Sequence, residues 1–141
     1  MKNIFITVFI FFPTFLFSQI SLYRSEFPVS AKIGFEGAGL DLALGNRFAI
    51  DATSLIIYNT FKARYFILEK NASPFIGAGV GKFNGGFGGN GGNQWSVGFV
   101  GWEHSYKVFL IQIIIQVPIT KQNSYGLSPF FFNLNLGARL H

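Results

Sequence analysis

The chain has 141 residues, of which 50% are hydrophobic and 12% are charged, and its formal net charge is +5. The length corresponds to one domain, and the charged fraction is about half of the roughly 25% that is usual in soluble domains. So much apolar side chain with so little charge excludes a disordered chain. The absence of Cys excludes a disulfide scaffold, a thiol nucleophile and a Cys-based zinc site. A tightly packed soluble domain and a membrane protein remain.

Residues 1–18 predict a secretory signal peptide. Lys2 supplies a short positive region, an apolar run follows it, and Ser18 is a small residue suited to a cleavage site. A retained transmembrane anchor is the alternative, but the run is shorter than the about 20 residues that span a bilayer, and Pro13 interrupts it. We therefore expect cleavage after Ser18 and a single mature domain over residues 19–141.

The mature chain alternates between apolar and other residues with a period of two, which is typical of β-strands. In 107–117, one face is apolar and the other carries Gln112 and Gln116. No stretch shows a convincing period of 3.6 residues, so we predict an all-β fold. The strands expected from the alternation are 35–44, 47–57, 61–69, 73–83, 94–102, 107–117 and 128–141.

An even number of strands is the rule for single-chain outer-membrane barrels. We expect the eighth strand between Gln19 and Lys32, within Ile20–Phe27. Eight strands is about the smallest number that closes, and side chains then fill the interior. The prediction is a closed antiparallel up-and-down transmembrane β-barrel. Short connections are expected at 45–46, 58–60, 70–72 and 103–106, and long ones at 84–93 and 118–127.

The alternation alone does not decide between a soluble barrel and a membrane barrel. The polar faces mix amide, glycine and charged residues of both signs, as the interior of a narrow membrane barrel can. The run 130–132, three consecutive Phe, would be an aggregation hazard on a soluble edge strand. Aromatic residues near expected strand ends suggest interfacial girdles: Phe61, Phe75, Trp95, Trp102, Tyr106, Phe109 and Phe130.

Three segments resemble a known family. Residues 74–81, PFIGAGVG, resemble the aromatic and glycine-rich strand of OmpA-like and opacity-type small outer-membrane β-barrel proteins. Residues 62–66 resemble the preceding strand of that group and residues 135–140 its terminal strand, so the resemblance covers roughly residues 31–141. The signal peptide ending in Phe-Ser-Gln resembles those of the Bacteroidetes group of Gram-negative bacteria. The resemblance implies contact with outer-membrane lipid and insertion by the barrel-assembly machinery.

In that family both termini lie in the periplasm, which would place the two longest connections on the outer side of the membrane. The candidate surface-contact residues are therefore in the Gly-rich loop, namely Asn84, Phe87, Asn90 and Asn93, with a second candidate segment at Thr120–Ser128. We expect this barrel to have a structural, adhesive or surface-interaction role.

The charged residues expected to face the interior predict a polar network in which basic and acidic groups pair. A narrow ion path is the alternative, but several Lys and Arg side chains would obstruct so small a barrel. The candidate network consists of Glu36, Asp41, Asp51, Lys62, Arg64 and Arg139.

The sequence predicts no enzyme, cofactor or metal site. Residues 86–91 match a dinucleotide-binding glycine pattern, but no helix follows them. Glu103-His104-Ser105 has triad residue types, yet adjacent residues rarely converge, and neither His104 nor His141 has ligand spacing to a partner. A lipid-modifying enzyme remains a third hypothesis, which predicts that His104→Ala abolishes an activity without unfolding the chain. The basic residues form no run, so we expect no nucleic acid partner.

A second hypothesis for the whole chain is a secreted soluble β-barrel that binds a small apolar ligand, as lipocalins do. In that barrel the faces rich in Phe, Ile and Leu would point inward.

Overall fold

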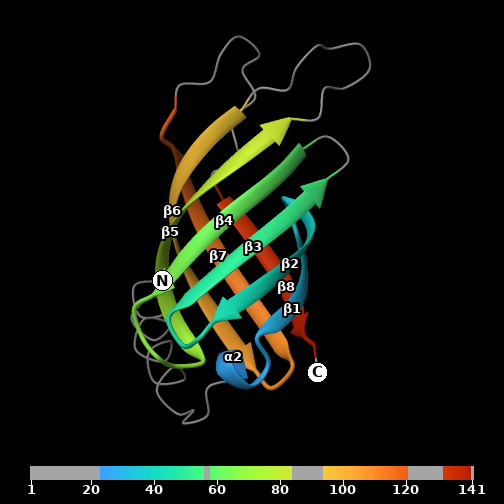
Figure 1. Cartoon of the computed structure of the whole chain (residues 1–141), viewed down its shortest axis with the longest axis vertical. Helices are drawn as coiled ribbons and strands as arrows, with labels where there is room; N and C mark the ends of the chain where they lie inside the picture. The colour runs from blue at the N-terminus through green and yellow to red at the C-terminus, as the bar shows by residue number, and fades with distance from the viewer. Residues whose placement is uncertain (1–22, 56–57, 84–93, 121–131, 141) are drawn as a thin grey trace, which may run out of the picture.

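The computed structural model describes residues 23–55, 58–83, 94–120 and 132–140. Eight antiparallel strands follow one another around a closed barrel in sequence order (Figure 1). They are β1 (Val29–Gly34), β2 (Gly37–Leu44), β3 (Phe48–Leu55), β4 (Tyr58–Phe66), β5 (Ala72–Phe83), β6 (Gln94–Tyr106), β7 (Phe109–Pro118) and β8 (Phe132–Arg139). The predicted all-β, eight-stranded up-and-down barrel is confirmed. The expected signal peptide, residues 1–18, lies outside the described residues.

The barrel closes through pairing of its first and last strands. β1 and β8 are antiparallel, with a register that runs from Ser30 opposite Arg139 to Gly34 opposite Asn135. Closure leaves no row of unpaired backbone groups along a sheet edge. The connections at 84–93 and 119–131 join strands at one end of the barrel, which we call the loop end. The short helix α2 (Tyr23–Glu26) lies at the opposite end with Leu140, and we call this the helix end.

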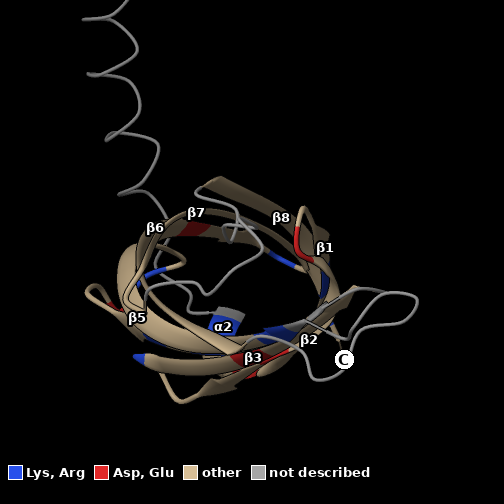
Figure 2. Cartoon of the chain, turned by 90° about the horizontal axis from the view of Figure 1, so that it is seen from above, with Lys and Arg blue, Asp and Glu red and all other residues tan. Residues whose placement is uncertain are grey.

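The prediction that Ile20–Phe27 forms the eighth strand is wrong. Residues 23–26 form α2, and the first strand begins only at Val29, after Pro28. Pro28 has no backbone N–H to give to a sheet ladder. Viewed along the barrel, α2 lies within the ring of strands (Figure 2). Residues 23–26 therefore lie inside the barrel at the helix end instead of extending its wall.

Other expected strand boundaries also differ, since β4 ends at Phe66 and β8 covers Phe132–Arg139. Residues 59 and 60 lie within β4, and the connection there is at 56–57. β6 continues through Tyr106, so 103–106 is strand, and the turn consists of Lys107 and Val108. Lys107 has a φ of 52°, a conformation that Gly, Asn or Asp would have predicted from the sequence and Lys does not.

The segment expected as one strand, 35–44, contains a turn at Phe35 and Glu36. Gly37 follows this turn with a φ of 107°, which glycine adopts without steric cost. A side chain at Gly37 would also collide with the carbonyl of Ser54 on β3. The result is a short β1–β2 hairpin whose turn lies well below the loop-end tips of β5 and β6 (Figure 1).

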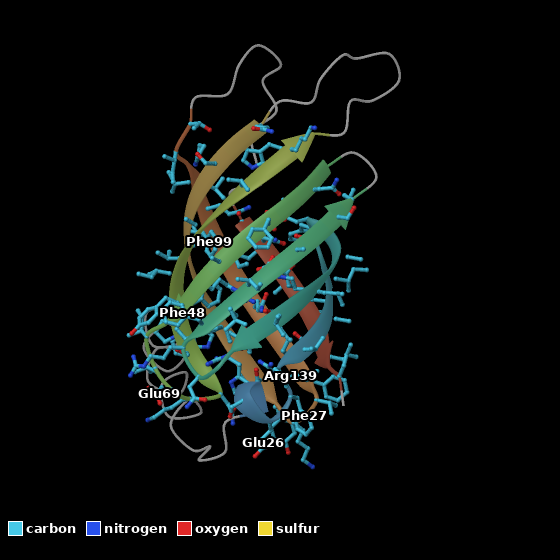
Figure 3. The ribbon with its side chains drawn as sticks, in the orientation of Figure 1. Glu26, Phe27, Phe48, Glu69, Phe99 and Arg139 are labelled. Atoms are coloured by element: carbon cyan, nitrogen blue, oxygen red, sulfur yellow. The ribbon has the colours of Figure 1, made fainter. Side chains whose placement is uncertain are left out.

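The alternation sorts the side chains between the two faces of the wall as the sequence predicted. Odd-numbered residues of β7 from Phe109 to Val117 point outward, while Leu110, Gln112 and Gln116 are buried inside. The side chains project from both faces of the ribbon, with Phe48 among those outside the barrel (Figure 3). The exposed large apolar residues include Ile33, Leu40, Leu42, Leu44, Phe48, Phe61, Ile76, Val80, Val100, Phe109, Ile111, Ile115, Val117, Phe132 and Leu136.

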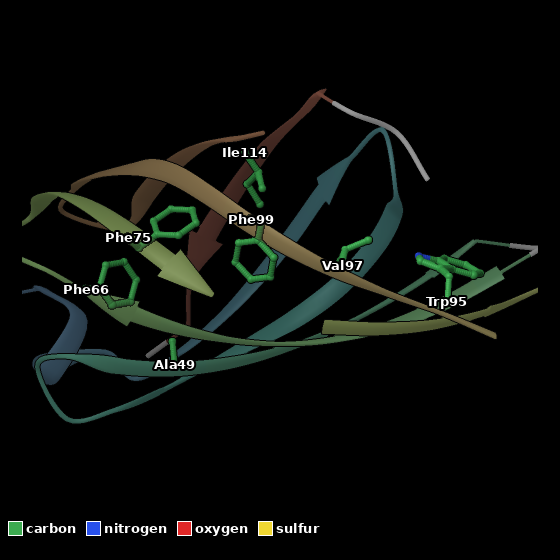
Figure 4. Packing of buried hydrophobic residues seen from close by; sticks show 7 residues of the cluster. All are labelled: Ala49, Phe66, Phe75, Trp95, Val97, Phe99 and Ile114. Atoms are coloured by element: carbon green, nitrogen blue, oxygen red, sulfur yellow. The ribbon is translucent and has the colours of Figure 1, made fainter. Parts of the chain in front are cut away.

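The glycines of β5 make room for large side chains of β6. Gly77 lies opposite Phe99 and Gly81 lies opposite Trp95, and the ring in each pair occupies the space where a glycine Cβ would be. The relation is reversed once, because Phe75 of β5 covers Gly101 of β6. The rings of Phe75 and Phe99 then pack edge to face with centroids 6.2 Å apart (Figure 4). Cross-strand pairing of this kind is a unit of sheet stabilisation.

Two of the expected girdle residues therefore belong to the interior. Phe75 is 1% exposed and Trp95 is 5% exposed, so neither can lie at an outer interface. Phe61, Trp102, Tyr106 and Phe109 do lie on the outward face. Phe130 lies outside the described residues.

Candidate functional site

Most of the buried charged side chains in the described part of the chain lie in the lumen of the barrel. All six residues of the candidate polar network are buried there: Glu36, Asp41, Asp51, Lys62, Arg64 and Arg139. Three further charged residues that the sequence analysis did not assign to the network are buried with them, namely Arg24, Lys32 and Glu103. Buried charges in proteins are paired or hydrogen-bonded because an isolated charge is expensive to desolvate.

Arg64 on β4 lies at the centre of this lumenal network. Its guanidinium pairs with Asp41 of β2, lies 3.5 Å from Asp51 Oδ2 and 3.4 Å from Glu103 Oε2. Its Cζ also lies 5.4 Å from the ring centroid of Phe75, a cation–π distance. One side chain therefore joins three acidic residues from three other strands.

Glu103 on β6 forms a second centre near the helix end. Its Oε1 accepts hydrogen bonds from Arg139 Nη2 at 2.9 Å and from Ser105 Oγ at 3.3 Å. Its Oε2 accepts one from Gln112 Nε2 at 2.9 Å. Gln112 also donates to Asp41 Oδ2 at 3.1 Å, which joins the second centre to the first.

Arg24 enters the Glu103 centre from α2. Arg24 Nη2 lies 3.1 Å from Glu103 Oε1, and Nη1 donates to the carbonyl oxygen of Asn46 at 2.9 Å. Its guanidinium stacks on Phe66, with Cζ 3.4 Å from the ring centroid. Although α2 is only four residues long, these contacts tie it to the turn after β2, to β4 and to β6.

Glu36 forms the third centre, nearer the loop end. The β1–β2 turn directs its side chain inward, where it pairs with Lys62 and accepts a hydrogen bond from Gln116 Nε2 at 2.6 Å. Lys62 and Gln116 belong to β4 and β7, so the contacts join strands on different sides of the lumen. The Lys62 ammonium also lies 5.7 Å from the ring centroid of Phe99.

The charges of the strands and their turns balance inside the lumen. The buried cations there are Lys32, Lys62, Arg64 and Arg139, and the buried anions are Glu36, Asp41, Asp51 and Glu103. Arg24, which comes from α2, is the additional cation. The wall and its turns thus contribute four cations and four anions. Each anion forms an ion pair with one of these cations.

The outward face of the wall has the opposite character. Lys82, at the loop end of β5, is the one charged side chain that the outward faces of the eight described strands carry. At a rise of about 3.4 Å per residue and a tilt of about 40°, the outward residues Phe109 to Ile119 span roughly 25 Å along the barrel axis. The outward wall is therefore an apolar band, with its one charge at the loop-end edge, around a charged interior.

The helix-end rim carries an exposed ion pair. Arg47 Nε donates to Glu69 Oε1 at 2.6 Å, and Arg47 Nη1 donates to Tyr65 Oη at 3.1 Å. The hydrogen bond from Arg47 lowers the pKa of Glu69, with further contributions from Asn46 and from the positive charge of Arg47. Since both groups are exposed, the pair orders the rim rather than the lumen.

The triad-like segment of β6 does not form a catalytic arrangement. Glu103 and Ser105 are buried in the lumen, whereas His104 lies between them and faces outward. Within the described ranges, no group of three or more His, Cys, Asp or Glu side chains gathers as metal ligands would. The surface-contact candidates Asn84, Phe87, Asn90 and Asn93, and most of Thr120–Ser128, lie outside the described residues, as does His141.

Comparisons with protein-family models, with curated proteins and with solved structures find no match to this chain. None of the helices in the described part of the chain is long and apolar enough to span a membrane.

Proposed function

We propose that this chain is an integral outer-membrane β-barrel protein with a non-enzymatic structural, adhesive or surface-interaction role. The observation that carries the proposal is the distribution of side chains across the wall, with charge inside and apolar residues outside. Soluble monomers rarely expose a contiguous apolar patch of more than a few hundred Å². A lipid bilayer is the solvent in which such an outer surface is favourable, and a closed barrel is the sheet that can span it.

The dimensions and the aromatic residues also support a membrane-spanning wall. The roughly 25 Å height of the apolar face matches the band expected of outer-membrane barrels. Aromatic side chains lie toward both margins of this band: Phe35, Phe61 and Phe132 toward the loop end, and Phe48, Tyr65, Trp102, Tyr106 and Phe109 toward the helix end. Aromatic residues are enriched at both membrane–water interfaces of such barrels, where their rings lie at the level of the lipid headgroups.

The lumen supports a structural role. Three centres of ion pairs and hydrogen bonds occupy it, two of them linked through Gln112, and α2 adds Arg24 at the helix end. A lipocalin-like barrel would need its Phe, Ile and Leu faces inside to hold an apolar ligand. Here those faces are largely outward, which favours the membrane barrel over the soluble alternative.

The resemblance to OmpA-like and opacity-type barrels agrees with this proposal. It suggests secretion through the N-terminal segment, insertion by the barrel-assembly machinery, and loops 84–93 and 121–131 facing the outside of the cell. Outer-membrane lipid then contacts the outer wall of the barrel, and the loops contact a surface ligand whose identity the sequence does not give.

Cell fractionation tests the proposal. The chain, expressed from its full coding sequence in a Gram-negative host, should sediment with outer membranes, resist an alkaline wash and dissolve only in detergent. It should also migrate differently on gels before and after boiling, because a closed barrel resists detergent until it is heated. Recovery from the soluble periplasmic or culture fraction would refute the proposal.

A further inference from the structure

A hollow of about 610 Å³ lies on the outer wall at the loop end, over β4, β5 and β6. Its polar rim is a single row across the sheet, because Asn59 pairs with Lys82 and Lys82 pairs with Gln94. The row below it consists of Phe61, Val80 and Ser96. We call these six residues the rim patch. Its volume lies within the range of about 300–1,000 Å³ that is usual for small-molecule sites.

The polar row of the rim patch is rich in hydrogen-bond donors. Lys82 is exposed, and no salt bridge found among the described residues involves it. Asn59 and Gln94 flank it on the neighbouring strands, which are about 4.8 Å away on either side. An ammonium group with an amide on each side is suited to an anion with several oxygens, such as a phosphate.

The charge of the loop end favours the same class of ligand. The whole chain has six acidic residues. Four of them are buried in the lumen, and the other two, Glu26 and Glu69, lie at the helix end. The outward wall near the loop end therefore presents Lys82 without any carboxylate to compete for it. The helix end, in contrast, mixes cations and anions, as the Arg47–Glu69 pair shows.

The lower part of the rim patch is suited to an acyl chain. Below Phe61 and Val80, the next outward row consists of small residues, since Ala63 pairs with Ala78 and Ala78 pairs with Gly98. A Cβ placed on Gly98 would meet only Ile119, at 3.7 Å, so the space in front of this row is open. A polar row above and a shallow apolar trough below match a molecule with a charged head and a hydrocarbon tail.

The third side of the hollow is built by the chain that leaves β7. Ile119 donates its backbone N–H to Ser96 at 2.8 Å, and Thr120 Oγ1 accepts the backbone N–H of Ser96 at 2.9 Å. These bonds hold Thr120 beside the end of β6, where it also lines the hollow. The rim patch is thus an open hollow over three strands with Thr120 at one side, and not a lone lysine on a smooth wall.

We propose that the rim patch binds the headgroup of an anionic lipid that carries a phosphomonoester, in the membrane leaflet at the loop end, with Lys82 as the anion-binding residue. The inference rests on the proposed membrane insertion of the barrel. Lys82 and Gln94 contact the phosphate beside Asn59, whose Oδ1 accepts a hydrogen bond from Ser54 Oγ at 2.6 Å, and an acyl chain runs down the wall over Val80 and Ala78.

The test uses the detergent-purified chain inserted into phosphatidylcholine vesicles that contain a small fraction of a bisphosphorylated glycolipid. Flotation of the vesicles after an alkaline wash first shows whether the barrel is inserted. Inserted protein is then extracted in mild detergent, and its retention of a bisphosphorylated glycolipid over phosphatidylcholine is measured by native mass spectrometry. Protein that the wash removes refutes the membrane proposal itself, whereas inserted protein without lipid preference overturns only the inference about the rim patch.

The variants make the assignment specific to Lys82. Lys82→Gln should weaken retention of the phosphorylated lipid about five-fold, and Lys82→Arg should restore it. Lys107→Gln is the matched control, because Lys107 is an exposed lysine at the opposite rim. Unchanged retention by Lys82→Gln, or an equal loss in Lys107→Gln, would overturn the proposal in favour of unspecific attraction. Competition by inorganic phosphate as effective as that by the lipid would overturn the lipid as the ligand.

Discussion

Arg24 and Glu103 are 79 residues apart in sequence, yet the guanidinium of one lies 3.1 Å from the carboxylate of the other inside the lumen. This contact connects the segment before the first strand with the wall of the sixth. Both side chains are 1% exposed. A buried hydrogen bond between two charged groups therefore holds the N-terminal segment to the barrel. Hydrogen bonds between charged groups are stronger than those between neutral groups.

Arg24→Gln should release α2 from the lumen. Hydrogen bonds to charged groups contribute about 1.5–3 kcal/mol, and Glu103 keeps Arg139 and Gln112 as partners, so the barrel should remain folded. We expect faster amide hydrogen exchange in residues 23–27 with little change in the strands. Glu26→Gln is the control on the same helix, because Glu26 is exposed. Equal exchange rates in wild type and Arg24→Gln would contradict the fastening role.

Arg64→Met should lower the free energy of unfolding of the barrel more than Arg24→Gln does. It leaves Asp41 and Asp51 buried without their central cation, and breaking a buried pair on one side costs about 3–5 kcal/mol. Lys32 remains beside Asp51, so a second change, Asp41→Leu, should recover part of the loss. Urea unfolding in lipid or detergent measures both. Additive losses in the double variant would show that Arg64 and Asp41 are not coupled.

Gly81→Ala tests the fit between β5 and β6. A Cβ at Gly81 would enter the space of the Trp95 indole, and overpacking of this kind costs about 1–3 kcal/mol. Gly98→Ala is the matched control, because the nearest atom to its added Cβ is 3.7 Å away. Trp95 fluorescence and the unfolding midpoint should change in the first variant and not in the second. Equal tolerance of both variants would contradict the packing.

Much of this arrangement follows from local pattern. Alternation with a period of two decides which side chains share a face, and it does so without knowledge of any partner. For that reason Asp41, Lys62 and Arg139 could be assigned to one interior before their contacts were known. The partners depend on strand register and on which strands face each other across the lumen, and neither is local information. The link between Glu36 and Gln116, 80 residues apart, is of this kind.

The errors in the prediction have similar physical causes. Phe75 and Trp95 were assigned to the girdle from their position near strand ends, although Phe75 shares its face with Gly77, which is an inward position. α2 is too short to show a helical period. The turn at Lys107 lacks Gly, Asn or Asp, the residues by which such turns are recognised. The two aromatic residues could have been assigned from their face, whereas α2 and the turn at Lys107 carry no local sequence signal.

The rim pair Arg47–Glu69 predicts a pH dependence. The pKa of Glu69 is lowered in the folded chain by the hydrogen bond from Arg47, so the pair persists below the ordinary pKa of a glutamate and is lost as the pH falls through the lowered value. Arg47→Gln should raise the pKa of Glu69 toward its ordinary value. NMR titration of a chain with labelled Glu side chains measures this change. A Glu69 titration that is the same in both proteins would exclude Arg47 as the cause.

Charged substitutions on the outward wall should show whether that wall faces lipid or water. Val100 lies at the middle of β6 and is 54% exposed on the outward face. In a bilayer, Val100→Arg should cost about 2–4 kcal/mol, whereas Tyr106→Arg, on the same face at the helix end, should cost about 0–1 kcal/mol. On a water-exposed surface both changes would fall within about 0.5 kcal/mol of zero. Urea unfolding of the inserted protein measures the difference, and equal stabilities for the two variants would mean that Val100 does not face lipid.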